Sequence, residues 1–162
     1  MKNNVFIMCG LPGIGKSTWI KNFKADNKIV ISRDEIRFSM LEKDEDYFAK
    51  EPDVFDEFIR QIRKTLLNKE GGKNVFIDAT HLNKASRKKL FDGMGLIPMY
   101  ENNIIAVVFP NDLDRALKQN ELRKGQGRSY VPRGVIRRMH EQFVPPVLEE
   151  GFNKIMEVDL NE

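Results

Sequence analysis

The chain has 162 residues, of which 41% are hydrophobic and 31% charged, the composition of one folded domain with a proper core rather than of a disordered chain. Its formal net charge of +3 and pI near 8.9 are too mild to require a nucleic-acid partner. No apolar run approaches the length of a membrane span, and the N-terminus lacks the apolar core of a signal peptide, so we expect no membrane partner.

Strand-like and helix-like segments alternate along the chain. Near-continuous apolar and β-branched runs predict strands buried on both faces, at residues 5–9, 28–32, 74–78, 103–109 and 154–158. The patterns between them predict helices that begin at Thr18 and at Pro132 and that cover residues 35–41, 53–69, 84–91 and 113–122. This alternation predicts an α/β fold, a parallel central sheet of about five strands flanked by helices, in a single domain over residues 1–162.

Local features add detail to this framework. Asn83 is expected to cap the helix at 84–91, and Asn111 or Asp112 the helix at 113–122. Residues 43–51 are charged and lack clean periodicity, which predicts a surface excursion. Cys9, the single cysteine, ends the first strand, so we expect a small core residue rather than a reactive thiol. One cysteine excludes an internal disulfide and fits a reducing cytoplasm.

The most specific motif lies between the first strand and the first helix. Residues 10–17, Gly-Leu-Pro-Gly-Ile-Gly-Lys-Ser, fit G-x-x-x-x-G-K-[ST], and strand, glycine-rich turn and helix are the context that a phosphate-binding P-loop requires. Lys16 would reach the β- and γ-phosphates, and Ser17 would bind Mg²⁺. We expect ATP or another nucleoside triphosphate, with Mg²⁺, to contact Gly10, Pro12, Gly13, Ile14, Gly15, Lys16, Ser17 and Thr18. The competing interpretation is a chance glycine-rich turn.

Polar groups follow the second and third strands, and ligands sit at the carboxyl ends of parallel strands. Asp34 is the candidate general base for an attacking hydroxyl, and Arg37, one turn further on, suits an acceptor phosphate. Asp78 is the candidate outer-shell ligand of Mg²⁺. Thr80 and His81 are candidate substrate contacts; a turn residue is the other interpretation of His81, since no second metal ligand stands at a fitting spacing. The competing interpretations are a helix N-cap for Asp34, a solvated arginine for Arg37 and a turn residue for Asp78.

A basic, glycine-containing segment, residues 123–131, separates the last two predicted helices. It predicts a mobile lid, roughly over residues 119–138, that closes over a nucleotide. Arg123 and Arg128 are the candidates for an arginine clamp, because guanidinium groups offset the charge of a transferred phosphoryl group. Further arginines extend the basic strip into the next helix: Arg133, Arg137 and Arg138. The competing interpretation is a solvated linker.

These motifs together resemble the 5′-kinase domain of phage-type polynucleotide kinases, within the group of small P-loop kinases. The matching segments are residues 10–19, 32–37 (Ser-Arg-Asp-Glu-Ile-Arg), 77–83 (Ile-Asp-Ala-Thr-His-Leu-Asn) and 131–139, which follows the basic lid. The resemblance implies Asp34 as general base, Arg37 on the acceptor's phosphate and a lid arginine on the donor phosphates. It also implies a cytoplasmic setting in a bacterium or a phage-infected cell. His81 departs from the pattern, because asparagine is usual there.

Three functions are therefore in competition. The leading hypothesis is an ATP-dependent kinase that transfers a γ-phosphate to the 5′-hydroxyl of a polynucleotide, DNA or RNA, in nucleic-acid repair. The second keeps the chemistry but takes a small-molecule acceptor such as a nucleoside, a sugar or an antibiotic. The third is a non-catalytic nucleotide-binding module. No Asp-x-Asp-x-Thr motif is present, so a 3′-phosphatase activity is not expected. The sequence leaves the oligomeric state open.

Overall fold

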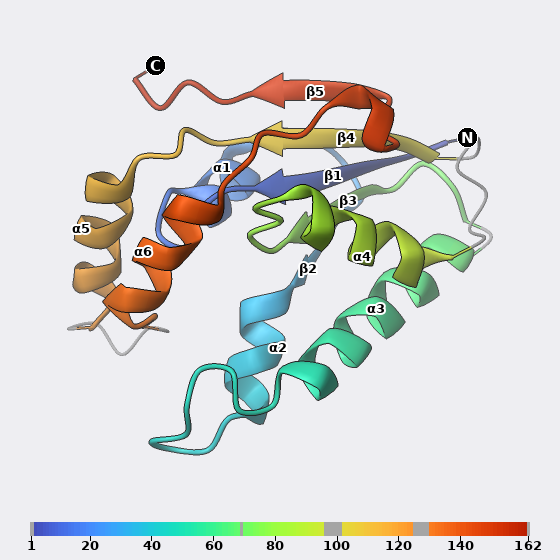
Figure 1. Ribbon diagram of the computed structural model, residues 1–162. Helices are drawn as coiled ribbons and strands as arrows, with labels where there is room; N and C mark the ends of the chain where they lie inside the picture. The colour runs from blue at the N-terminus through green and yellow to red at the C-terminus, as the bar shows by residue number, and fades with distance from the viewer. Residues whose placement is uncertain (1, 69, 96–101, 125–129, 162) are drawn as a thin grey trace.

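A single parallel sheet of five strands organises the molecule. The computed structural model describes residues 2–68, 70–95, 102–124 and 130–161. The strands are β1 (Asn3–Cys9), β2 (Lys28–Ser32), β3 (Asn74–Asp78), β4 (Asn102–Val108) and β5 (Lys154–Glu157). They are ordered β2-β3-β1-β4-β5, and all neighbouring strands pair in parallel (Figure 1). This confirms the predicted α/β class, and β1 lies between β3 and β4, where connections leave toward both edges of the sheet.

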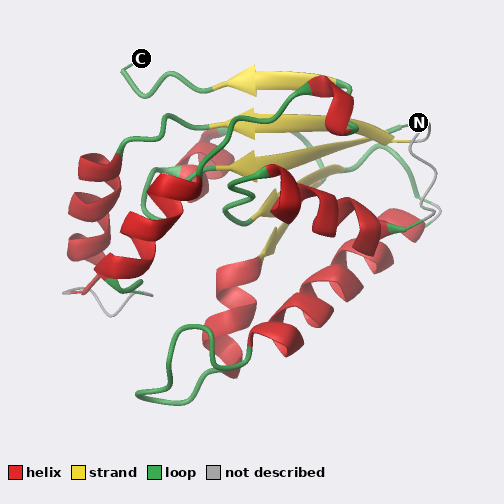
Figure 2. Cartoon of the chain, in the orientation of Figure 1, coloured by secondary structure: helices red, strands yellow, loops and turns green. Residues whose placement is uncertain are grey.

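Helices cover both faces of the sheet (Figure 2). They are α1 (Lys16–Asn22), α2 (Arg33–Met40), α3 (Glu51–Leu67), α4 (Lys84–Met94), α5 (Leu113–Lys124) and α6 (Arg133–Gln142), with a short 3-10 helix η2 (Leu148–Glu150) before β5. In Figure 1, α5 and α6 lie side by side near the carboxyl ends of β1, β4 and β5. No helix among residues 2–68, 70–95, 102–124 and 130–161 is long and apolar enough to cross a membrane.

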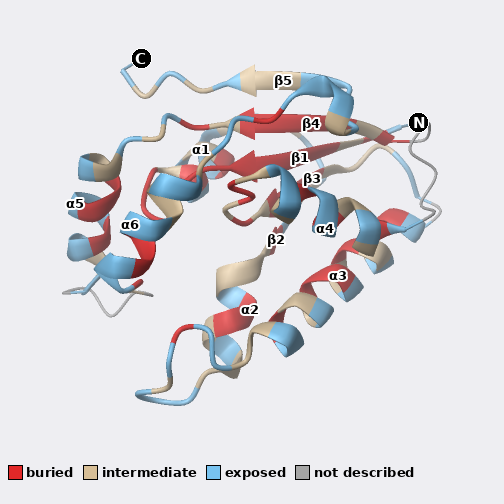
Figure 3. Cartoon of the chain, viewed as in Figure 1, coloured by how far each residue is buried: buried red, intermediate tan, exposed pale blue. Residues whose placement is uncertain are grey.

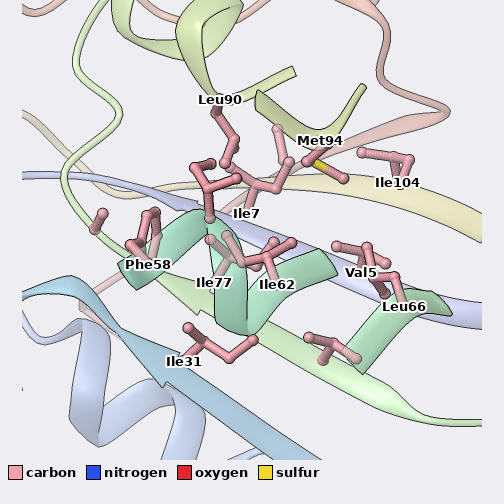
Figure 4. Close-up of a cluster of buried hydrophobic side chains, with 14 of the residues drawn as sticks. Val5, Ile7, Ile31, Phe58, Ile62, Leu66, Ile77, Leu90, Met94 and Ile104 are labelled. Atoms are coloured by element: carbon pink, nitrogen blue, oxygen red, sulfur yellow. The ribbon is translucent and has the colours of Figure 1, made fainter. Parts of the chain in front are cut away.

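The alternation of side chains along the strands divides the core into two layers. On one face, Val5, Ile7 and Ile77 pack with side chains of α3 and α4, as Figure 4 shows with Phe58, Ile62 and Leu90. On the other face, Phe6, Met8 and Phe76 pack with side chains of α1, α5 and α6. The central strands are buried on both faces, because helices cover each of them (Figure 3). Cys9 is buried in the first layer, as predicted, and burial raises the pKa of its thiol to about 12.

A buried ion pair ties the last part of the chain to α4. Arg87 is fully buried, and its Nε donates to Glu150 Oε1 of η2 at 2.7 Å. Its Nη1 donates to the carbonyl oxygen of His81 at 2.9 Å. The charge and the donors of the guanidinium are thereby satisfied, which burial of an arginine requires.

Several predicted boundaries need correction. Helix α2 begins at Arg33, and its N-cap is Ser32, whose side chain accepts from the Glu35 amide at 3.2 Å, so the N-cap interpretation of Asp34 is wrong. Helix α3 runs over Glu51–Leu67 rather than 53–69, because Pro52 in the first turn favours an earlier start. Most of residues 43–50 are exposed or partly exposed, as a surface excursion predicts, but Tyr47 in their midst is buried, and Glu51 already belongs to α3.

The other caps agree with the sequence. Asn83 caps α4 through its side chain, which accepts from the Ser86 amide at 2.9 Å. Asp112, the second of the two candidates, accepts from the Arg115 amide at 3.1 Å at the start of α5. Helix α4 continues to Met94 and α5 to Lys124, beyond their predicted ends.

Candidate active site

One large cleft opens at the carboxyl ends of β1, β2 and β3, with a volume of about 1030 Å³. Its wall comes from the P-loop and α1, from β2 and the end of β3, from α2 with the connection to α3 and the first residue of α3, from the start of α4, and from α5 and α6. The predicted site residues on its wall are Pro12, Gly13, Lys16, Ser17, Asp34, Arg37, Asp78, Thr80 and Arg123. The sequence prediction that polar groups meet at this edge is therefore confirmed in space.

The P-loop wraps around the start of α1. Gly13 has a φ of 82°, and a Cβ there would lie 2.8 Å from the carbonyl oxygen of Ala116, so α5 leaves no room for a side chain. Gly15, the N-cap of α1, has a φ of 117°, which L-residues rarely adopt. Four other predicted members, Gly10, Ile14, Gly15 and Thr18, are not among the residues that line the cleft, and the side chain of Ile14 is buried in the core.

Lys16 is the buried cation of the loop. It is 9% exposed, and its Nζ donates to the carbonyl oxygens of Gly10 at 2.8 Å and Leu11 at 2.9 Å. Burial lowers the pKa of the ammonium, while the carboxylates of Asp78 and Asp34 act in the opposite direction. The loop thus holds a positive charge in place by its own carbonyl groups, and an anion that reaches the cleft can exchange with them.

Ser17 and Asp78 form the candidate metal position. Ser17 Oγ donates to Asp78 Oδ2 at 3.4 Å. Burial raises the pKa of the Asp78 carboxyl, and the nearby Lys16 ammonium opposes this effect. Hydroxyl and carboxylate oxygens are the ligands that Mg²⁺ prefers, and Mg²⁺ is commonly held by one or two protein groups together with phosphates and water. The donor set therefore fits Mg²⁺ delivered with a nucleotide.

Asp34 lines the same cleft as part of a hydrogen-bonded group. Tyr47 Oη donates to Asp34 Oδ1 at 2.9 Å, and Arg37 forms an ion pair with the same oxygen atom. Arg37 Nη1 also donates to Tyr47 Oη at 2.7 Å. Both contacts use Oδ1, so the orientation of the carboxylate is fixed by its neighbours.

Arg37 is held on its other side by Glu51. Its Nη2 donates to Glu51 Oε1 at 2.7 Å and its Nε to Glu51 Oε2 at 3.2 Å, while Arg33 Nη2 contacts Oε1 at 2.5 Å. Burial would raise the pKa of Glu51, but the two guanidinium groups outweigh it and the pKa is lowered. Burial acts in the opposite direction on Arg37, where the facing Tyr47, Glu51 and Asp34 keep the pKa raised. The predicted phosphate ligand is thus already paired with two carboxylates.

A buried amide of α5 holds the segment that leads into α6. Asn120 of α5 is fully buried; its Nδ2 donates to the carbonyl oxygen of Val131 at 2.7 Å, and its Oδ1 accepts from the Val131 amide at 3.0 Å. Arg123, one turn further along α5, lines the cleft. Arg128, the other clamp candidate, lies outside the described residues.

Of the two candidate substrate contacts after β3, the structure brings only Thr80 to the cleft. His81 is buried with a φ of 42° and is not among the residues that line the cleft. Its Nδ1 contacts the carbonyl oxygen of Met8 at 2.7 Å, and its Nε2 has no partner within the described part of the chain. Burial lowers the pKa of the imidazole to about 3, helped by the positive charges of Arg33, Lys16 and Arg87.

This geometry agrees with a sequence comparison. A family model described as an AAA domain (AAA_33) matches residues 5–146. The chain belongs to this family. The matched range contains the whole wall of the cleft, from Pro12 to Gln142.

The known proteins to which this AAA domain is similar carry names that refer to different substrates. The L-seryl-tRNA(Sec) kinase of Methanococcus maripaludis is 29% identical over 150 residues, which cover 88% of this chain and 53% of that protein. The chain thus spans about half the length of this curated relative. A chain of the Pnkp1/Rnl/Hen1 RNA repair complex aligns with a TM-score of 0.65 at 24% identity, over 87% of this chain and 44% of that one. A gluconokinase from Sinorhizobium meliloti 1021 aligns with a TM-score of 0.59 at 15% identity, over 98% and 83%. At these identities the structures show the fold alone, that of the P-loop kinases.

Several residues of the site in this AAA domain were missed by sequence reasoning. Tyr47 and Glu51 lie in the charged stretch predicted to be a surface excursion, where no periodicity marked them. Asn120 lies in a mostly polar helix with nothing to distinguish it from its neighbours. Met139 could have been found, because it shares one face of α6 with the buried Val135 and with Arg138 of the basic strip at helical spacing.

Proposed function

We propose that the chain is an ATP-dependent kinase that transfers the γ-phosphoryl group to the 5′-hydroxyl of a polynucleotide. One observation carries the proposal: Lys16 and Ser17 of the P-loop share a cleft with an oriented carboxylate, Asp34. A phosphate cradle alone would serve a switch or a binding module. A carboxylate that faces the cradle supplies the group that an attacking hydroxyl needs.

The transfer divides the work among the residues of the cleft. Asp34 accepts the proton of the attacking hydroxyl as its oxygen bonds to the γ-phosphorus, and the bond from that phosphorus to the β–γ bridging oxygen breaks to release ADP. Lys16 exchanges its carbonyl partners for phosphate oxygens, and Arg123 neutralises charge from the lid. Ser17 and Asp78 would hold Mg²⁺, which would supply positive charge to offset that of the phosphate oxygens.

The choice of a polynucleotide end rests on the motif order and on the names of similar proteins. Residues 32–37 and 77–83 follow the order of the phage-type kinases. Two of the similar proteins, the seryl-tRNA kinase and the RNA repair complex, are named for RNA. The wider setting in nucleic-acid repair is part of the same proposal, as are the cytoplasmic location and the use of ATP with Mg²⁺.

The test is transfer of labelled phosphate from ATP to 5′-hydroxyl oligonucleotides of DNA and of RNA. We expect transfer by the unaltered protein and a loss of at least about 100-fold in kcat for Asp34→Asn, with nucleotide binding kept. Asp56→Asn, an exposed carboxylate on α3, is the matched control and should leave kcat unchanged. Lack of transfer to every oligonucleotide end would refute the proposal.

A small-molecule acceptor is the second candidate, and one observation favours it. Arg33 and Arg37 are already paired with Glu51 and Asp34, so the acceptor side of the cleft does not present an unpaired guanidinium from either residue. A neutral polyhydroxyl acceptor needs no such cation. Comparing rates on a nucleoside, a nucleoside 3′-monophosphate and an oligonucleotide separates the candidates. The transfer rate of a polynucleotide kinase should rise from each of these acceptors to the next, whereas a small-molecule kinase should show no such rise.

A further inference from the structure

The connection between α2 and α3 brings two adjacent aromatic rings to the part of the cleft wall that holds Asp34 and Arg37, here called the acceptor side. This connection, residues 41–50, projects beyond the ends of both helices (Figure 1). Tyr47 is 6% exposed, whereas Phe48 is 41% exposed, and both line the cleft. Isolated exposed apolar residues are normal on protein surfaces. An exposed phenyl ring close to the proposed catalytic carboxylate needs an explanation, because its contact with water is unfavourable and a polar substrate would not cover it.

The backbone around Phe48 is fixed before any ligand binds. The Phe48 amide donates to Asp46 Oδ2 at 3.1 Å, and the Phe48 carbonyl oxygen accepts from the Glu51 amide at 3.3 Å. Lys50 Nζ closes the connection by donating to the carbonyl oxygen of Met40 at 2.7 Å and pairing with Glu45 at 3.1 Å. A ring on such a support loses little conformational entropy when it is covered.

The ring of Phe48 is also tied to the reacting carboxylate. It meets the Tyr47 ring edge to face, with centroids 4.7 Å apart and planes at 89°. The hydroxyl of Tyr47 donates to Asp34 Oδ1 at 2.9 Å. Phe48 therefore stands one aromatic ring away from the group that accepts the proton of the acceptor hydroxyl.

The chemistry of this position selects the ligand. A phenyl ring offers neither donor nor acceptor to the hydroxyls of a sugar, but it offers a face to a flat heterocycle. Base stacking on aromatic side chains tolerates any base, because every base has a π-face. The cationic side chains of this wall face other rings: Arg33 lies over Phe55 and Phe58, and Arg37 over Tyr47.

We propose that Phe48 is the stacking platform for the nucleobase of the acceptor's 5′-terminal nucleotide. The inference rests on the proposed function and narrows it, because it requires an acceptor whose terminal sugar carries a base. Tyr47 orients the carboxylate and Phe48 seats the base, so one short connection aligns the 5′-hydroxyl with Asp34.

The test compares two oligonucleotides that differ only at the 5′-terminal nucleotide, which carries a base in one and is abasic in the other. Each is assayed with the unaltered protein, with Phe48→Ala, with Phe48→Trp and with Leu67→Ala, an exposed apolar side chain at the end of α3. We expect Phe48→Ala to lower kcat/KM for the base-bearing end about 5- to 150-fold, mainly through KM. The abasic end should be a poor substrate that Phe48→Ala does not worsen. Phe48→Trp and Leu67→Ala should keep the preference for a base.

This experiment gives different results if the stacking role of Phe48 is wrong and if the proposed kinase function is wrong. Equal losses on both ends with Phe48→Ala, or no loss on either, would overturn the stacking role while transfer itself persists. Absence of transfer by the unaltered protein to both ends would refute the polynucleotide kinase and the stacking role together. Because Phe48 is exposed, the melting temperature of Phe48→Ala should match that of the unaltered protein, and this measurement accompanies the kinetics.

Discussion

Tyr47 is the residue on which the acceptor side of the cleft depends most directly. Its hydroxyl donates to Asp34 and accepts from Arg37, so it links the proposed base to the cation beside it. Burial raises the pKa of this phenol above its usual range, and the carboxylate of Asp34 adds to the effect, so the hydroxyl keeps its proton. Tyr47 is thus a permanent donor to Asp34 at any physiological pH.

Removing this hydroxyl should lower the rate of transfer without weakening nucleotide binding. For Tyr47→Phe we expect kcat to fall about 10-fold or more, because a hydrogen bond to a charged group contributes about 1.5–3 kcal/mol. KM for ATP should stay unchanged, since the phosphate cradle lies at the P-loop. Ser39→Ala, which deletes a hydroxyl from α2 away from the cleft, is the control. A rise in KM for ATP with unchanged kcat would contradict this role.

His81 should make the fold sensitive to mild acid. Its pKa is about 3 in the folded chain and about 6.5 when unfolded, so between these values the unfolded state binds the extra proton and stability rises with pH. At pH 5 this linkage removes about 2 kcal/mol relative to pH 7.

His81→Asn should remove this dependence, because asparagine does not titrate and tolerates the positive φ of this position. Urea unfolding at pH 7 and at pH 5 measures the free energy of unfolding for both proteins. We expect the loss between the two pH values to be smaller in the variant by about 2 kcal/mol. Equal losses would show that His81 is not the group responsible.

At the scale of elements, one buried side chain of α5 holds the start of the segment that leads into α6. The side chain of Asn120 pairs with both backbone groups of Val131, as a strand neighbour would. This pairing fixes the segment that leads into α6 against the helix that carries Arg123. Both helices contribute residues to the cleft, among them Arg123 of α5 and Arg138 of α6.

Asn120→Ala should weaken this anchor. It leaves a buried amide and a buried carbonyl of Val131 without partners, and we expect a loss of about 2–4 kcal/mol in the free energy of unfolding. Gln119→Ala, at the exposed neighbouring position, should change stability little. Chemical denaturation measures both variants, and equal stabilities for Asn120→Ala and the unaltered protein would contradict the anchoring role.

At the scale of the whole molecule, nucleotide binding should stabilise the fold. A ligand present at 100 times its Kd adds about 2.7 kcal/mol, which corresponds to an increase of roughly 5–10 °C in Tm for a domain of this size. We expect Mg²⁺ with ATP to raise Tm by this amount, and Lys16→Ala to abolish the increase. Lys24→Ala, exposed and outside the cleft, should keep it. An undiminished increase in Lys16→Ala would exclude the P-loop as the binding site.

Most of the fold could be predicted from the sequence, because its signals are local. The apolar runs of β2 and β3 match the structure at both ends, and Asn83 identified the start of α4. The errors fall at helix ends, where Ser32 rather than Asp34 caps α2 and Pro52 favours an earlier start of α3. Several neighbouring residues can serve as the cap or first residue of a helix, and the packing of the helix decides which of them does.

The site could be predicted only in part. Lys16, Ser17, Asp34, Arg37 and Asp78 were predicted from motifs and positions after strands, and the structure brings them into one cleft. Glu51 and Tyr47 carry no motif, and the partners they bind stand 10 to 18 residues away in the sequence. Such contacts exist only after α2 and α3 have packed together, so no local sequence pattern predicts them.

The sequence by itself determined that this chain holds a phosphate-binding loop at the end of the first of several parallel strands. That information is local, since glycines, a lysine and a serine at fixed spacing between strand and helix specify the loop. Only the tertiary structure decided what faces the loop: an aspartate oriented by Tyr47, an arginine already paired with Glu51, and an exposed Phe48 beside them. The physical reason is that packing of the helices, rather than the order of the residues, sets the distances between these groups.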